Sequence, residues 1–281
     1  VYSLEILQNI LELFEHNTKG EARRSSKGNQ LKWEDGGIWY KADYTGYEGL
    51  AEYLVSGLLA YSSLAPEEYV SYQTEEILYK TNKYRACKSR NFLPPGWKLI
   101  TLERLFQSAR GEGLNKAVYS IAEHADRLRF LAEQAAELTQ LEGFGYYLDK
   151  LLTIDALFFN EDRHTHNIAV LLDETGKYHY CPIFDHGAAL LSDTTMDYPL
   201  HGDIDELMET VRAKTFCQDF DEQLDLAEQF YGNQIRFYYG EKEIDKLLLE
   251  EPFYPEETKR RVKIILMNQR RKYRYLFGKR S

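Results

Sequence analysis

One stretch of the sequence, Asn160 to Gly187, limits the possible folds of this chain more than any other. It opens with a polar loop, Asn-Glu-Asp-Arg-His-Thr-His-Asn, and continues with an apolar run from Ile168 to Leu172. A polar turn that contains glycine follows, and then a second strand-like run from Tyr178 to Phe184. Two such runs joined by a short turn predict a β-hairpin. Because a hairpin reverses the chain, Asp185 should return beside the polar loop.

Three side chains at the two ends of this hairpin suit phosphoryl transfer. Asp162 and Asn167 lie five positions apart, the interval of the protein-kinase catalytic loop H-R-D-x-x-x-x-N. Asp185 follows the second strand, and Gly187 lets the chain bend after it, as in a D-F-G element. Transfer of a γ-phosphoryl group depends on positioning and charge neutralisation, with a carboxylate to orient the attacking hydroxyl and oxygen ligands for Mg²⁺. The pattern therefore predicts a site for ATP and Mg²⁺.

The same two segments resemble a known group of kinases. Residues 162–167 and 184–187 are similar to the D-R-H-x-x-N and D-F-G elements of phosphoinositide kinases. Asn160 and the longer hairpin make the region resemble HipA-type and CtkA-type bacterial Ser/Thr kinases more closely. The resemblance implies an α+β, bilobal protein-kinase-like fold. We expect a small antiparallel β-sheet lobe with one helix over residues 1–93, and a larger, mainly helical lobe over residues 94–281.

The resemblance also implies roles for individual residues. Asp162 would be the catalytic base, and His164 is a second candidate because phosphoinositide kinases use the histidine of D-R-H. Asn167 and Asp185 would bind Mg²⁺. HipA-type proteins usually carry lysine before the metal-binding asparagine, where this chain has His166. The resemblance therefore leaves open what contacts the γ-phosphate from that side.

A kinase also needs a strand lysine for the nucleotide phosphates and a helix glutamate to orient it. Lys41 lies in a predicted strand, Ile38–Ala42, and its alternative role is to snorkel to solvent. Gly46–Leu64 has the periodicity of a helix with two buried faces. Glu52 in this helix is our choice for the partner of Lys41, and Glu48 is the alternative.

Other parts of the expected first lobe are less regular. Residues 21–33 read as strand, turn and strand without a G-x-G-x-x-G motif, and the candidates for phosphate binding there are Ser25, Ser26 and Gly28. A surface turn without a ligand is the other interpretation. Next come two predicted strands, a linker that meets the adenine, and a helix capped by Thr101; they are Tyr69–Tyr72, Tyr84–Cys87, Lys88–Pro95 and Leu99–Phe106.

The rest of the chain has helical periodicity, and its composition narrows the classes of partner. Helices are predicted over Asn115–Gln140, Phe144–Phe159, Ile204–Phe216, Phe220–Tyr239 and Glu256–Leu276. The basic run Lys259–Arg261 and its continuation at 270–272 predict a solvated face that pairs with nearby glutamates. Net charge −10 and a pI near 5.3 argue against nucleic-acid binding.

Neither a transmembrane run nor a signal peptide is evident, so we expect no membrane association. The three cysteines, Cys87, Cys181 and Cys217, have spacings that fit neither a zinc site nor a disulfide framework. Buried thiols in a reducing compartment are the simplest interpretation, and together these features predict a cytoplasmic enzyme.

The acceptor of the phosphoryl group remains open at this stage. A protein Ser or Thr is favoured by family analogy, and autophosphorylation at Ser192, Thr194 or Thr195 is an option. Alternatives are a small-molecule or lipid kinase, a nucleotide-binding pseudokinase or regulatory module, and a metallohydrolase whose ligands are Asp162, His164, His166, Asp185 and His186. The sequence does not reveal whether an antitoxin or a DNA-binding subunit is a partner.

Overall fold

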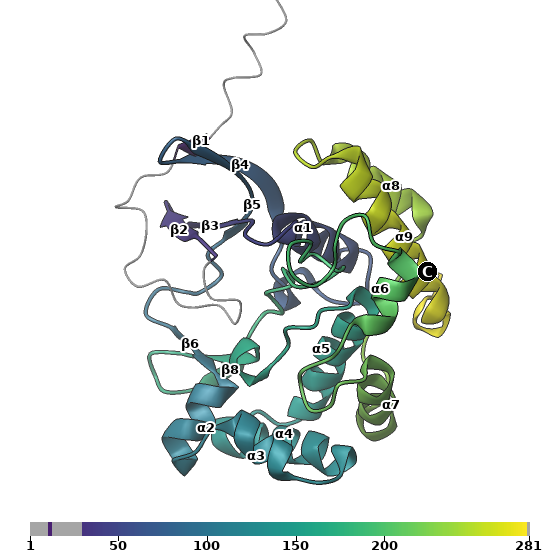
Figure 1. The fold of residues 1–281 in the computed structure, drawn as a ribbon. Helices are drawn as coiled ribbons and strands as arrows, with labels where there is room; N and C mark the ends of the chain where they lie inside the picture. The colour runs from purple at the N-terminus through teal and green to yellow at the C-terminus, as the bar shows by residue number, and fades with distance from the viewer. Residues whose placement is uncertain (1–10, 13–29, 280–281) are drawn as a thin grey trace, which may run out of the picture.

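The computed structural model describes residues 11–12 and 30–279, and its two parts differ in secondary structure (Figure 1). A β-sheet with one long helix forms the first part, and a mainly helical part follows. This arrangement confirms the expected α+β class. The predicted phosphate turn, with Ser25, Ser26 and Gly28, lies outside the described residues.

The sheet of the first part is antiparallel except at one edge. Within the described residues its strand order is β1-β4-β5-β3-β2, formed by β1 (Leu11–Glu12), β2 (Lys32–Asp35), β3 (Ile38–Ala42), β4 (Gln73–Tyr79) and β5 (Asn82–Arg90). Only the β1–β4 pair is parallel among these strands. Gly36 and Gly37 join β2 to β3 with φ of 56° and 80°, a turn conformation that glycine adopts without steric cost. The strand predicted for Lys41 is confirmed as β3.

One predicted strand of this sheet is wrong. Tyr69–Tyr72 precedes β4, and Val70 donates its N–H to the carbonyl of Ile183 at 2.9 Å instead of joining the sheet. The alternating apolar pattern of that segment reflects burial of Val70 and Tyr72 beneath the sheet. Tyr84–Cys87 does lie in a strand, but β5 continues to Arg90, so the linker begins later than Lys88.

Helix α1 (Glu48–Leu59) is shorter than the predicted Gly46–Leu64 but is buried on two sides, as expected. Glu48 sets its start, since its carboxylate accepts hydrogen bonds from the N–H groups of Thr45 and Gly46. Gly46 is required there because a Cβ would lie 1.9 Å from the carbonyl oxygen of Ser192. The start of α1 is thus fixed against the segment that follows Asp185.

A second sheet, β6-β7-β8, contains the predicted hairpin. Its strands are β6 (Lys98–Thr101), β7 (Ala169–Leu172) and β8 (Tyr178–Tyr180). The strand predicted to reach Phe184 ends earlier because Pro182 has no N–H, and Ile183 bonds instead with Glu68 and Val70. The helix predicted from Leu99 starts at 102, where the Thr101 hydroxyl caps it by accepting a bond from the Arg104 N–H at 3.3 Å.

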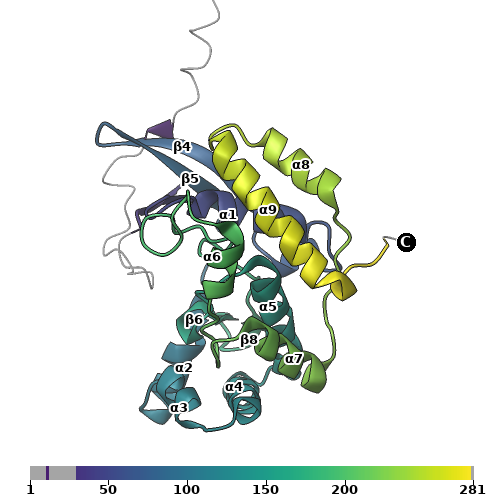
Figure 2. The same ribbon diagram turned by 45° about the vertical axis from the view of Figure 1, so that its right-hand side comes forward.

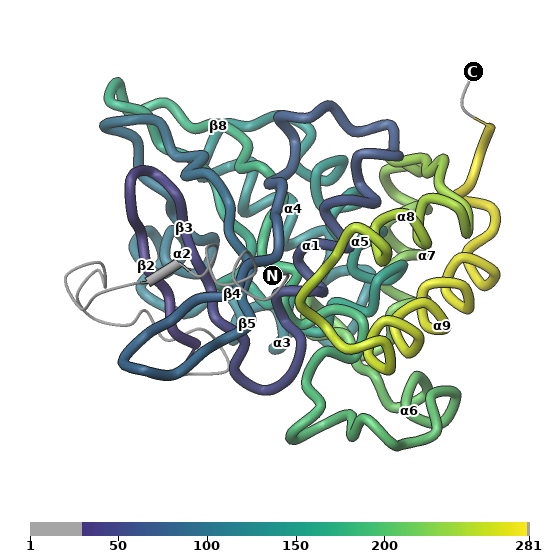
Figure 3. Tube along the Cα trace, turned by 90° about the horizontal axis from the view of Figure 1, so that it is seen from above, coloured from purple at the N-terminus to yellow at the C-terminus, as the bar shows by residue number. Residues whose placement is uncertain are grey.

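The second part is built from helices around one large apolar core. They are α2 (Leu102–Arg110), α3 (Leu114–Ser120), α4 (His124–Thr139), α5 (Phe144–Phe158), α6 (Ile204–Thr210), α7 (Phe220–Tyr231), α8 (Glu241–Glu250) and α9 (Glu256–Lys272). Helices α8 and α9 return beside α1 (Figure 2), at the opposite end of the molecule from β2 and β3 (Figure 3). None of the helices in the described ranges has the length and hydrophobicity of a transmembrane span.

Two residues of the basic run of α9, Lys259 and Arg261, do not lie on the solvated face expected from the sequence, whereas Arg260, Arg271 and Lys272 are exposed as expected. The Arg261 guanidinium is buried and donates to the carbonyls of Tyr198, Pro199 and Leu200. Lys259 is also buried, and its ammonium lies 3.6 Å from a Glu251 carboxylate oxygen. Helical spacing alone predicted exposure, but these side chains connect α9 to neighbouring segments and are not available to a polyanion.

Candidate active site

Lys41 connects strand β3 with the helix that follows it and with a segment far along the chain. Its ammonium on β3 lies 2.6 Å from Oε1 of Glu52 on α1 and 2.9 Å from Oδ1 of Asp185, which follows the hairpin. The expected contact with Glu52 is therefore present, whereas Glu48 is engaged at the start of α1. The direct contact between Lys41 and Asp185 closes the gap between β3 and the segment after β8.

Burial and the opposite charges nearby shift the pKa values of these three side chains in opposite directions. Burial alone would lower the pKa of Lys41, but Asp185 and Glu52 outweigh it and raise that pKa well above its usual value. Burial would raise the pKa of Asp185, yet Lys41 and Lys32 lower it below its usual range. Burial prevails for Glu52 and raises its pKa, while Lys41 opposes the shift. At neutral pH, Lys41 is thus a cation and Asp185 an anion.

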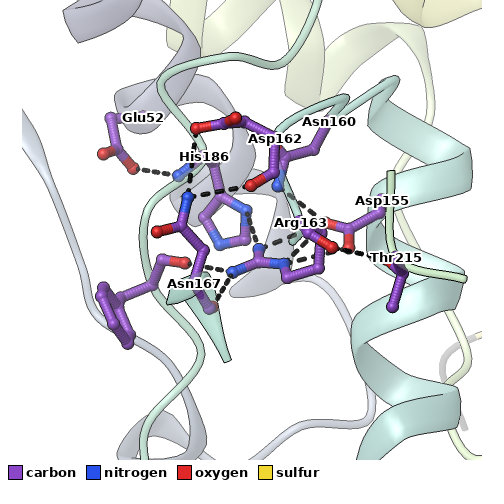
Figure 4. Close-up of polar contacts among 9 residues, drawn as sticks. Glu52, Asp155, Asn160, Asp162, Arg163, Asn167, His186 and Thr215 are labelled. Carbon is purple, nitrogen blue, oxygen red and sulfur yellow. Dashed lines mark hydrogen bonds and ion pairs between the residues drawn. The ribbon is translucent and has the colours of Figure 1, made fainter. Parts of the chain in front are cut away.

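The loop after α5 places Asp162 and Asn167 side by side (Figure 4). The Asn167 amide nitrogen donates to the Asp162 carbonyl at 2.8 Å and to Asp162 Oδ2 at 3.1 Å. These bonds do not use the amide oxygen of Asn167. His164 lies on the other side of the carboxylate, with Nε2 3.6 Å from Asp162 Oδ1. Burial lowers the pKa of His164 although Asp162 opposes it, so its imidazole is neutral at pH 7.

Arg163 fixes this loop from beneath, a role that the sequence reasoning missed. Its guanidinium donates to the carboxylate of Asp155 on α5 at 3.0 Å. It also donates to the carbonyls of Asn167 at 3.0 Å and Phe184 at 2.9 Å. One buried cation therefore ties α5, the loop and the segment before Asp185 together (Figure 4). The signal was Asp155, a carboxylate in an otherwise apolar stretch of a helix.

The bend after the hairpin lies at Asp185 and not at Gly187, which corrects the expectation from the sequence. Asp185 has φ of +65°, a left-handed conformation that costs about 1 kcal/mol or more for a residue with a Cβ. The next residue, His186, donates its N–H to Glu52 Oε2 at 2.8 Å. Glu52 thus holds both Lys41 and the backbone beside Asp185.

The candidate autophosphorylation sites contact the start of α1. Ser192 is buried and donates its hydroxyl to the Gly187 carbonyl at 2.6 Å, so it is closed to an acceptor role in this conformation. The hydroxyls of Thr194 and Thr195 both donate to the carbonyl of Thr45, at 3.5 and 2.7 Å. These bonds hold the segment after Asp185 in place.

The geometry does not support the metallohydrolase interpretation. Among the described residues, His, Cys, Asp and Glu donors come close enough to share an ion at His124, Cys217 and Glu222, a set that includes none of the candidate site residues. The five ligands proposed for a hydrolase do not gather in that way. Two hollows on the described surface, of about 840 and 410 Å³, are likewise lined by other residues. The candidate site is therefore defined by direct contacts between its side chains.

Comparisons with solved structures assign the fold. The chain matches the crystal structure of the Helicobacter pylori proinflammatory kinase CtkA over 93% of its own length and 92% of that chain, with a TM-score of 0.60 and 17% identity. It also matches Shewanella oneidensis HipA, solved with HipB and operator DNA, over 92% and 67% of the two chains, with a TM-score of 0.41 and 14% identity. No protein-family model and no curated protein matches the sequence. The chain has a protein-kinase-like fold similar to that of CtkA, as its motifs indicated.

Proposed function

We propose that the chain is an ATP- and Mg²⁺-dependent phosphotransferase whose acceptor is a Ser or Thr hydroxyl of a protein. The acceptor protein includes the chain itself, by autophosphorylation. The observation that carries this proposal is the contact of Lys41 with both Glu52 and Asp185. A sheet lysine, a helix glutamate and an aspartate after a hairpin are the parts that kinases assemble around nucleotide phosphates. The CtkA-like fold supports the same conclusion.

The donor set fits Mg²⁺. Asp185 offers an ionised carboxylate, and Asn167 offers the amide oxygen that its bonds with Asp162 leave unused. Hard oxygen ligands of this kind suit Mg²⁺, which retains waters and bridges phosphate oxygens. Bound there, the ion would neutralise charge that develops on the transferred group. Lys41 would add a positive charge for the phosphates beside Asp185.

Asp162 would accept the proton of the attacking hydroxyl as the new O–P bond forms and the γ-phosphate leaves ADP. His164 is the alternative base, because it is neutral and lies beside Asp162. Asn167 holds the Asp162 carboxylate, and Arg163 fixes the loop backbone. The loop is thus pre-organised for proton transfer at a fixed position.

We place the division between the lobes at residues 93 and 94, after β5 and before β6. Next to it, Val70, Tyr72, Cys87, Phe92 and Phe184 form an apolar cluster that would contact the adenine. The three cysteines are free and buried, which fits action in a reducing cytoplasm.

Transfer of label from γ-³²P-ATP tests the proposal. The wild type, with Mg²⁺ and a general protein acceptor such as casein, should label the acceptor or itself. Asp162→Asn and Asp185→Asn should each reduce labelling by about 100-fold or more. Asp126→Asn is the matched control, because Asp126 pairs with Arg129 on the exposed surface. ATP binding without labelled protein would contradict a protein kinase, and label in an added small-molecule or lipid fraction would identify a different acceptor.

A further inference from the structure

The first residue of β2, Lys32, lies next to the candidate site although nothing in the sequence marked it. Lys32 and Lys41 are register partners in the antiparallel β2–β3 pair. Register partners share one face of a sheet, with Cβ atoms about 4.5–5.5 Å apart. The next pair, Trp33 and Tyr40, points to the opposite face, where both rings are buried in an apolar cluster. Both lysines therefore face the side on which Asp185 lies.

The surroundings of Lys32 differ from those of Lys41. Lys41 makes direct ion pairs with Glu52 and Asp185. Lys32 makes no side-chain hydrogen bond or ion pair with any residue in the part of the chain that the structure describes. Burial lowers its pKa, the charge of Lys41 lowers it further, and Asp185 and Glu52 oppose the shift. A half-buried ammonium beside a second one is unfavourable unless an anion joins them.

We propose that Lys32 is a second phosphate-binding residue, which together with Lys41 holds the polyphosphate of a nucleoside triphosphate. The inference rests on the proposed function and extends it to a residue on a different strand. Two ammonium groups on one sheet face match a ligand that carries several negative charges along a short chain. A monophosphate would engage this pair only in part, and a nucleoside would not engage it.

If Lys32 binds phosphate, its substitution should weaken ATP binding without lowering the stability of the protein. Lys32→Met removes a half-buried charge and its repulsion of Lys41, so the melting temperature of the ligand-free protein should stay constant or rise. The same variant should bind ATP about tenfold or more weakly, since a hydrogen bond to a charged group contributes roughly that factor. Its affinity for adenosine should not change. A residue with only a structural role would lower the melting temperature and weaken all ligands alike.

Lys88→Met is the matched control. Lys88 is the register partner of Tyr40, so it lies on the opposite face of the same sheet, where its ammonium pairs with Glu75 at 2.8 Å. This variant should bind ATP like the wild type. Lys32→Arg keeps the charge and should retain most of the ATP affinity, which provides a second test if the methionine variant fails to fold.

Isothermal titration with ATP, ADP, AMP and adenosine decides between the outcomes. A loss of affinity in Lys32→Met that grows with the number of phosphates supports the inference. If the wild type binds ATP and Lys32→Met binds it equally well, or loses adenosine to the same extent, the role of Lys32 is refuted while the proposed function stands. If the wild type binds none of these ligands, the proposed function fails and the inference fails with it.

Discussion

Two clusters of charged side chains lie on either side of the loop at residues 160–167, and they are built differently. Beneath the loop, Arg163 and Asp155 are 1% and 2% exposed, and the guanidinium donates to a carboxylate and two carbonyls. In the second cluster, Lys41 and Asp185 are 14% and 25% exposed, and Lys32 next to them lacks a direct partner within the described residues. The closed cluster holds backbone in place, whereas the open one can exchange its internal ion pairs for a ligand. The contrast separates residues that position the site from those that would bind substrate.

The largest effect should come from breaking the closed cluster. Arg163→Met leaves the Asp155 carboxylate buried without its cation, and loss of one partner from a buried pair costs about 3–5 kcal/mol. Urea denaturation should show a drop of that size in the free energy of unfolding. Arg129→Ala, which removes an exposed pair with Asp126, should change it by less than about 1 kcal/mol. Equal effects of the two variants would contradict the contrast.

A substitution in the open cluster should reduce phosphoryl transfer more than it reduces the free energy of unfolding. Glu52→Gln retains an acceptor for the His186 N–H but leaves Lys41 with Asp185 alone. We expect phosphoryl transfer to fall by about 10- to 100-fold, because Lys41 loses its orienting carboxylate. Although Glu52 is as buried as Arg163, the glutamine keeps a hydrogen-bond acceptor and Lys41 keeps Asp185, so the free energy of unfolding should change by about 1 kcal/mol or less. A destabilisation as large as that of Arg163→Met would show that Glu52 mainly supports the fold.

A third carboxylate, Asp149, shows how a buried acid without a cation partner should make stability depend on pH. Asp149 is buried on α5, as Asp155 is, but it accepts its hydrogen bond from the backbone N–H of Gln234 and not from a cation. Burial raises its pKa to about 7; Glu228 adds to the rise, and the Gln234 N–H and Lys150 oppose it. Between about pH 4 and 7 the folded state keeps a proton that the unfolded state has released. Stability should therefore fall as pH rises through this window and then level off.

Asp149→Asn isolates that contribution. The variant keeps an acceptor for Gln234 and removes the buried charge, so it should be more stable than the wild type at pH 8, on the order of 1 kcal/mol. The gap should shrink as the pH is lowered to 5, as thermal melts at each pH would show. A gap that is independent of pH would mean that Asp149 does not titrate in this range.

Motif spacing and the periodicity of strands and helices were sufficient to predict several residues of the candidate site. Asp162, Asn167 and Asp185 stand at diagnostic spacings, and Lys41 and Glu52 lie on elements whose periodicity is clear. The same motifs predicted the fold, because few architectures bring a loop such as 162–167 next to a segment such as 184–187.

Residues whose position depends on long-range pairing escaped prediction. Lys32 became relevant through the strand register, and the strand predicted at Tyr69–Tyr72 is displaced because Val70 bonds with Ile183. The strained backbone of Asp185 and the burial of Arg261 likewise depend on contacts from distant segments. Periodicity reports which side of an element is apolar but does not identify what covers it.

The central claim is that Asp185 and Asn167 present an ion site at which Lys41 meets a nucleotide. Isothermal titration of ATP with Mg²⁺ and with EDTA, on the wild type and on Asp185→Asn, tests it most directly. The account predicts that Mg²⁺ tightens ATP binding to the wild type and that the variant loses this gain while it still binds adenosine. An Asp185→Asn protein that binds Mg²⁺-ATP as tightly as the wild type would contradict it.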